Sequence, residues 1–321
     1  MIYYNKQNIT NKDIALVKRA LKGEKITKGP LKDLFEKELK KFFNCKYTLV
    51  VSSGTAAQII LARAMNLKKT DCIIASPLTF VSGANSIELL GGETVFVDID
   101  EFTLSIDLYK LEEKIKYLKK KGKNVKGVMV TDYAGRPSEW KLLKILSKKY
   151  KFYLINDNCH ALGAKLDGSS KYAVKYADFV IQSFHAVKNI TTGEGGALLT
   201  NDKKIFFKAK LFAEHGFKLG KNIKDPWDYN LEDVGYNFRL SDINCSLGIS
   251  QLNRLNKFIK IRNHIAKYYD KIFINHPNII TPKINNKNKS SFHLYIIRIK
   301  KLTLKKKKKL FEIMKAKKVN L

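Results

Sequence analysis

The sequence predicts an α/β fold in which a mostly parallel sheet of about seven strands is covered by helices on both faces. Short apolar runs of four or five residues alternate with longer stretches whose apolar side chains recur at helical spacing. Strands that are joined through helices pair in parallel and are buried on both faces. The 321 residues also suffice for a second, smaller domain, so we expect a large domain at 1–242 and a C-terminal domain at 243–321.

The elements are expected in a regular order. A helix at 11–22, with Asn11 as its N-cap, is followed by a second helix at 31–43. Strands are predicted at 47–51, 72–75, 94–98, 128–131, 153–157, 179–182 and 197–200. Further helices are predicted at 56–65, 81–90, 107–119, 139–149 and 203–213. The smaller domain is expected to hold a helix at 243–269, a strand at 293–299 and a lysine-rich helix at 305–317.

The composition argues against several classes of protein. No apolar run approaches the roughly 20 residues of a membrane span, and the N-terminus lacks a signal-peptide pattern, so we expect a cytoplasmic protein with no membrane partner. The four cysteines lie far apart and indicate neither a zinc site nor a disulfide framework, and we expect no metal.

The net charge of +32 raises the question of nucleic acid. The basic residues are spread along the chain, and the densest runs, 119–126 and 305–309, carry no interleaved aromatic side chains for base stacking. We therefore expect no nucleic-acid partner. A positive field does favour anionic substrates that carry phosphate.

The stretch FVIQSFHAVKNITTGEGGALLT at 179–200 places Lys188 in a polar loop between two apolar strands. A desolvated lysine has a lowered pKa, and its free amine is the nucleophile that forms a Schiff base with a carbonyl. The alternative is an ordinary surface lysine in a hairpin turn. The residues at the other strand ends decide between the two.

Ligands of a parallel sheet bind at the carboxyl ends of its strands. Five segments fall there, and one pocket can collect all of them: residues 52–55, 77–80, 132–136, 157–160 and 183–188. The turn SSGT before a helix can bind an anion through its free N–H groups, although a plain helix cap has the same pattern.

The side chains at these ends suit one cofactor. Asp157 ends a buried strand, where a cationic ring nitrogen would satisfy its carboxylate, and Phe80 could stack on a flat ring. Lys188 would form the imine. Hydrogen bonds to a phosphate could come from Gly54, Thr55 and Ser183. Together these residues describe a site for pyridoxal 5′-phosphate.

The order of motifs SSGTAA, SPLTF, NDNCHALGA, SFHAVKNITTGEGGALLT and GYNFRLSDINCSLGISQL resembles the DegT/DnrJ/EryC1/StrS family of sugar aminotransferases. These are pyridoxal-phosphate-dependent enzymes of fold type I. The resemblance implies that Lys188 binds the cofactor and later shuttles a proton, and that Asp157 keeps the pyridine nitrogen protonated. It places His160 near the ring and Phe80 upon it.

The resemblance also implies the remaining roles. Gly54, Thr55 and Ser183 match phosphate ligands, and Asn237 matches an asparagine that reaches the phosphate from the other subunit, so a homodimer is expected. Positions near the substrate are matched by Thr27, Gly29, His185 and Arg239. The histidines outside the motifs, namely His215, His264, His276 and His293, are interpreted as structural. Asn158 is bulkier than the alanine commoner there, which raises the question of a small shift of the ring.

The resemblance implies an enzyme that transfers an amino group from glutamate to C4 of a nucleotide-linked 4-keto-6-deoxy sugar, in two half-reactions. Dehydratases of the same fold replace the lysine with histidine, so Lys188 argues against that reaction. Members of the family continue for several dozen residues beyond the position of Leu321, so we expect the smaller domain to be incomplete. A catalytically impaired or non-catalytic protein of this fold is the alternative.

Overall fold

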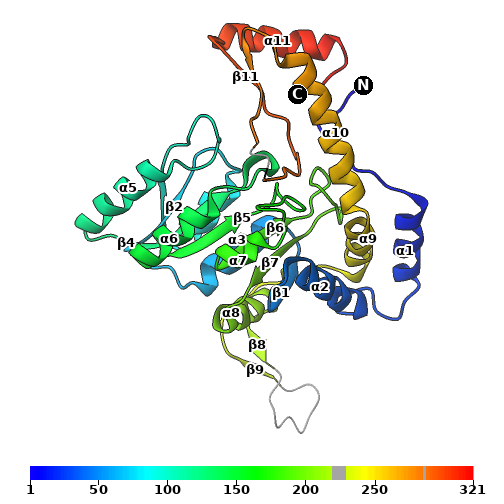
Figure 1. The fold of residues 1–321 in the computed structure, drawn as a ribbon. Coiled ribbons are helices and arrows are strands. Elements are labelled where there is room, and N and C mark those ends of the chain that lie inside the picture. The colour runs from blue at the N-terminus through cyan, green and yellow to red at the C-terminus, as the bar shows by residue number, and fades with distance from the viewer. Residues whose placement is uncertain (219–228, 285–286, 321) are drawn as a thin grey trace.

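The computed structural model describes residues 1–218, 229–284 and 287–320, and it confirms the α/β architecture. Seven strands form the central sheet in the order β1-β7-β6-β5-β4-β2-β3 (Figure 1). Their bounds are β1 Tyr47–Val51, β2 Asp71–Ala75, β3 Glu93–Phe96, β4 Asn124–Thr131, β5 Tyr153–Asp157, β6 Phe179–Ser183 and β7 Gly196–Thr200. β7 runs antiparallel to both of its neighbours, and every other pair in this sheet is parallel.

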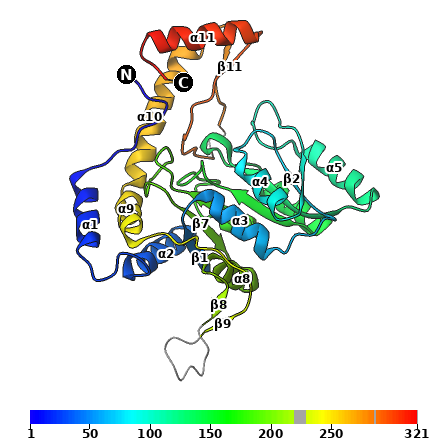
Figure 2. The same cartoon turned by 180° about the vertical axis from the view of Figure 1, so that it is seen from behind.

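Helices cover both faces of the sheet. One face packs against α3 (Gly54–Ala64), α4 (Ser82–Leu89) and α8 (Lys203–Ala213), which Figure 2 shows from behind. The other face packs against α2 (Pro30–Phe43), α5 (Leu108–Lys120), α6 (Trp140–Tyr150) and α7 (Tyr172–Tyr176). Successive strand residues alternate between the two cores: Leu154 lies in one and Ile155 in the other.

The remaining elements lie beside the sheet or beyond it. They are α1 (Asn11–Leu21), the two-residue strands β8 (Phe217–Lys218) and β9 (Asn230–Leu231), α9 (Asp242–Asn253), α10 (Leu255–Phe273), β10 (Ile279–Ile280), β11 (Arg298–Ile299) and α11 (Leu304–Ala316). α10 leads away from the sheet toward β11 and α11, and the two chain ends lie near each other there (Figure 1). Ile2 donates its N–H to the carbonyl of Lys318 at 2.8 Å and accepts from the N–H of Asn320 at 2.9 Å. The predicted division of the chain at 242/243 stays a prediction.

Three expectations about these elements are wrong. Thr10, not Asn11, precedes the first helix, and the Asp13 carboxylate accepts its N–H at 2.7 Å. The helix expected at 243–269 is two helices that meet at Arg254, whose guanidinium bonds to Asn8 and Asp13. The strand expected at 293–299 is limited to β11, because the preceding residues bond to loops of the large sheet instead.

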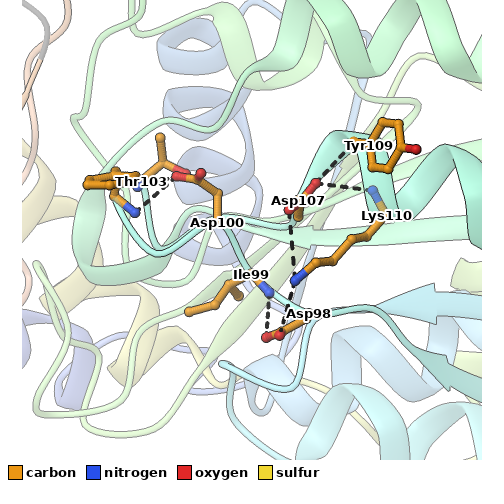
Figure 3. A network of polar contacts seen from close by, with 8 residues as sticks. Asp98, Ile99, Asp100, Thr103, Asp107, Tyr109 and Lys110 are labelled. Carbon is orange, nitrogen blue, oxygen red and sulfur yellow. Dashed lines mark hydrogen bonds and ion pairs between the residues drawn. The ribbon is translucent and has the colours of Figure 1, made fainter.

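The connection from β3 to α5 is ordered by its own aspartates (Figure 3). Asp100 accepts the N–H of Thr103 at 2.6 Å, and Asp107 caps α5 by accepting the N–H of Tyr109 at 2.9 Å. Lys110 lies 3.4 Å from the carboxylate of Asp98. These carboxylates are occupied by chain donors, and no group that could hold a metal ion is found among the described residues. In the same residues no helix combines the length and apolarity needed to cross a membrane.

The buried carboxylate of Asp132, directly after β4, joins four elements. Its side chain is 0% exposed and accepts five hydrogen bonds. The donors are Ser138 N–H at 2.8 Å, Trp140 Nε1 at 2.9 Å, Tyr172 Oη at 2.7 Å, Asn158 Nδ2 at 2.9 Å and Asn156 Nδ2 at 3.2 Å. Burial raises the pKa of this carboxyl, and the hydrogen bonds from Tyr172, Ser138, Trp140 and Asn156 act in the opposite direction. The ends of β4 and β5 and the starts of α6 and α7 are thereby tied to one group.

Replacing Asp132 with alanine removes the acceptor from all five donors, of which only Asn158 keeps another acceptor among the described residues, the Tyr172 hydroxyl at 3.0 Å. We expect the free energy of unfolding to fall by about 3 kcal/mol or more, because each unmatched buried donor carries its desolvation cost. Urea unfolding followed by circular dichroism measures this. Asp98→Ala, at an exposed carboxylate on the loop of Figure 3, is the control and should change the midpoint far less. Equal midpoints for the two variants would contradict the role of Asp132.

Candidate active site

A cavity of about 490 Å³ opens at the carboxyl edge of the sheet. All five strand-end segments that were predicted from the sequence contribute residues to its lining. Eight of the predicted site residues line it: Gly54, Thr55, Phe80, Asp157, His160, Ser183, His185 and Lys188. Tyr133 and Cys159, which lie within the predicted segments, also line it. The sequence analysis missed four further residues of the lining, namely Tyr4, Gln58, Glu194 and His293.

Lys188 is held by the loop between β6 and β7. The loop is closed at its base, where Phe184 donates its N–H to Gly195 at 2.8 Å and accepts from Thr192 at 2.9 Å. The ring of Phe184 is fully buried against Phe35 of α2. The backbone of Lys188 therefore has little freedom, while its half-buried side chain reaches the cavity.

The start of α3 lies unusually close to the sheet. Ser53 caps the helix by accepting the N–H of Ala56 at 3.0 Å. A Cβ atom on Gly196 would lie 2.3 Å from the carbonyl of Ser53, and one on Gly54 would lie 2.9 Å from Cβ of Ser183. Glycine at both positions lets β1, β7 and the first turn of α3 meet. Ser53 is thus a helix cap, and the positive end of α3 faces the cavity beside Thr55 and Ser183, as an anion site requires.

Asp157 presents its carboxylate to this cavity from the end of β5. The residue is 4% exposed, and its oxygens accept the N–H of Cys159 at 3.2 Å and a long bond from Gln58 at 3.4 Å. No lysine or arginine pairs with it among the described residues. The Oε1 atom of Gln58 is also buried without a partner. A bound cationic N–H donor would supply the hydrogen bond that these buried acceptor oxygens lack within the chain. The residues therefore fit the protonated pyridine ring of pyridoxal phosphate.

Asn158 does not crowd the cavity. Its amide points to the opposite side of the strand end, where it donates to Asp132 at 2.9 Å and to the Tyr172 hydroxyl at 3.0 Å and accepts from Gln182. The size of Asn158 therefore gives no reason to expect a shift of the cofactor ring.

His293, which the sequence analysis interprets as structural, is among the residues that line the cavity. It comes from the C-terminal part of the chain, is 5% exposed, and its ring centroid lies 4.4 Å from that of His160. Burial lowers the pKa of His160 to about 3 and that of His293 to about 2, and the charge of Lys188 acts in the same direction on both. Both imidazoles are thus neutral at physiological pH.

Four predicted residues lie outside the cavity within this chain. Gly29 is buried elsewhere, with its N–H bonded to Asp242 at 2.8 Å. Thr27 and Asn237 are exposed, and Arg239 pairs with the end of β1 through its backbone. One chain does not bring these four together with Lys188.

The neutral histidines predict a dependence of stability on pH. Below about pH 6.5 the unfolded chain binds a proton at His293 that the folded protein does not bind, so the free energy of unfolding falls as the pH falls. The slope for one such histidine is at most about 1.4 kcal/mol per pH unit. Urea unfolding at pH 7, 6 and 5 measures it, and His293→Phe should flatten the slope. An unchanged slope in that variant would contradict a neutral buried His293.

Comparison with known proteins gives the family. The model of the DegT/DnrJ/EryC1/StrS aminotransferase family matches residues 7–321. The UDP-4-amino-4,6-dideoxy-N-acetyl-beta-L-altrosamine transaminase of Campylobacter jejuni is 38% identical over 312 residues, which are 97% of this chain and 80% of that protein.

Two solved structures have the same fold at similar coverage. The aminotransferase PseC of Helicobacter pylori, involved in the biosynthesis of pseudaminic acid, has a TM-score of 0.89 and 33% identity, and the match covers 98% of this chain and 82% of that one. The PLP-form of the putative sugar aminotransferase Spr1654 of Streptococcus pneumoniae has a TM-score of 0.87 and 26% identity, with 98% of this chain and 82% of that one covered. Family model, sequence relatives and structures agree, and the chain belongs to the DegT/DnrJ/EryC1/StrS aminotransferase family.

Proposed function

We propose that this aminotransferase uses pyridoxal phosphate to move an amino group from glutamate to C4 of a nucleotide-linked 4-keto-6-deoxy sugar. The observation that carries the proposal is the cavity in which Lys188, Asp157 and the start of α3 converge. A lysine for covalent attachment, a carboxylate for the ring nitrogen and a helix N-terminus for the phosphate are the three groups that this cofactor needs.

The names of the relatives support the choice of substrate. The Campylobacter jejuni protein is named as a transaminase of UDP-4-amino-4,6-dideoxy-N-acetyl-beta-L-altrosamine. Exchange of the 4-amino group for a carbonyl oxygen gives the matching 4-keto sugar, so UDP-2-acetamido-2,6-dideoxy-beta-L-arabino-hex-4-ulose is the acceptor that we propose for this chain.

The residues of the chain have separate tasks in this scheme. When bound, the cofactor supplies an electron sink for the carbon that loses or gains a proton. Asp157 stabilises the protonated ring nitrogen on which that sink depends. Lys188 would hold the cofactor through its amine, and the same amine would move the proton at the reacting carbon of glutamate and then of the sugar. Gly54, Thr55 and Ser183 hold the phosphate.

We further propose a homodimer with shared active sites. Thr27, Gly29, Asn237 and Arg239 lie away from the cavity of their own chain, although the family resemblance assigns them to the phosphate and the substrate. A second copy that supplies Thr27, Asn237 and Arg239 would complete the site, whereas Gly29 is buried within its own chain. A cytoplasmic location stays a prediction. The alternative of a non-catalytic protein gains no support, because the cavity retains the lysine and the carboxylate that catalysis needs.

Lys188→Ala tests the attachment of the cofactor. Purified protein mixed with pyridoxal phosphate should show a visible absorption band that borohydride removes, and glutamate should move this band to shorter wavelength. The variant should lack the band, because it has no amine at this position. Lys175→Ala, at an exposed lysine of α7, is the control and should keep it. A band of equal strength in Lys188→Ala would refute the assignment.

Asp157→Asn tests the carboxylate. We expect the dissociation constant of pyridoxal phosphate to rise about tenfold or more, since loss of one partner of a buried charged pair costs at least about 1.4 kcal/mol. Fluorescence titration of the cofactor-free protein measures the constant. Asp98→Asn serves as the exposed control. Wild-type affinity in Asp157→Asn would show that the ring nitrogen has another partner.

A further inference from the structure

The C-terminal part of the chain reaches the active site through one short segment, residues 289–294, which we call the clasp segment. Lys289 exchanges two backbone hydrogen bonds of 2.8 Å with Lys165. Ser290 Oγ and Ser291 N–H both donate to the carbonyl of Gly135 at 2.9 Å, and Ser291 Oγ donates to the carbonyl of His160 at 2.8 Å. The clasp segment is thus fixed to the loops that follow β4 and β5.

The second side of the clasp segment is held by α10. Asn263 donates to the carbonyl of Ser290 at 3.0 Å, and Arg262 donates to the carbonyls of Phe292 and His293 at 3.0 and 3.2 Å. Arg262 therefore contacts the backbone carbonyl of His293.

The backbone at this point is both close-packed and strained. Gly135 has a φ of 93°, and a Cβ atom there would lie 2.4 Å from Ser291 Oγ. Phe292 has a φ of 43°, a conformation that residues other than glycine adopt at a cost. Such strain persists where surrounding contacts determine the conformation, and it is concentrated at functional sites. Here it turns the next residue, His293, into the cavity.

The position of His293 is unusual for a residue with a purely structural role. Its Nδ1 atom and that of His160 are both buried without a hydrogen-bond partner. The ring of His160 has two ring neighbours, with centroid distances of 4.4 Å to His293 and 5.9 Å to Tyr133. Lys188 and Arg262 are the cations that act on His293. The Nδ1 atom of His293 thus takes no part in the hydrogen bonding of the fold, whereas its ring packs against that of His160 with the two planes tilted by 36°.

We propose that His293 is a positioning residue of the cofactor site, which the clasp segment carries into the cavity so that its ring packs against that of His160, at an interplanar angle of 36°, and fixes the orientation of that imidazole near Lys188. This inference rests on the proposed use of pyridoxal phosphate and of His160 beside its ring. It assigns the C-terminal part of the chain a direct contribution to a site that otherwise consists of strand ends and the loops after them.

Two substitutions separate the ring face from the rest of the side chain. His293→Phe keeps a flat ring, and His293→Leu fills a similar volume without one. We expect His293→Leu to raise the dissociation constant of pyridoxal phosphate about threefold or more, in the range of an aromatic pair, and His293→Phe to restore the wild-type value. His264→Leu, at an exposed histidine of α10, should bind as the wild type does. Wild-type affinity in His293→Leu, or equal loss in both variants, would overturn the proposal.

A second measurement needs no cofactor and separates this proposal from the proposed function. Proton titration of His160, followed by NMR of histidine-labelled protein, should leave its ring neutral below pH 5 in the wild type and in His293→Phe. In His293→Leu the midpoint should rise by at least one pH unit, because the ring becomes free to turn toward water. If the wild type binds no pyridoxal phosphate, the proposed function fails, and this titration still decides the role of His293: identical midpoints in all variants overturn it.

Discussion

The active site depends on a carboxylate that never touches it. Asp132 is fully buried at the end of β4 and gathers donors from its own loop, from β5 and from the helices that follow. Asn156 and Asn158 are two of these donors, and Asp157 lies between them. Because neighbouring residues of a strand point to opposite faces, the bonds to Asp132 on one face set the direction of Asp157 on the other. The stability of the fold and the direction of the Asp157 carboxylate thus both depend on Asp132.

The architecture could be predicted because its signals are local. Most strands of the sheet are buried along nearly their whole length, so they appear in the sequence as short, mainly apolar runs, and β1 and β5 were predicted with the bounds observed. The edge strand β3 is only partly buried. The eight cavity residues could be found for a related reason, since all lie at the carboxyl end of a strand or in the segment that follows it. The break between α9 and α10 escaped prediction because one residue, Arg254, interrupts the helix without changing the apolar spacing.

His293 could not be predicted for a different reason. It lies more than a hundred residues from His160, in a mainly apolar run that predicts a strand, and nothing in that run indicates the contact. The hydrogen bonds that redirect residues 289–294 go to carbonyl groups of Gly135 and His160, and a carbonyl belongs to every residue type. Asn158 is a similar case, since its length suggests crowding, whereas the acceptor that turns it away, Asp132, lies 26 positions earlier. Contacts of this kind are decided by the fold alone.

The contact between Gly196 and the turn after β1 has a wider meaning for how the enzyme family can vary. A single added methyl group on β7 would press on the Ser53 carbonyl and lift the first turn of α3 from the sheet. The depth at which an anion could sit would then change, although no residue in contact with that anion had been replaced. The distance between the start of α3 and Lys188 therefore depends on the absence of a side chain at Gly196. The residue type at this position would limit the length of the ligand that the cavity accepts.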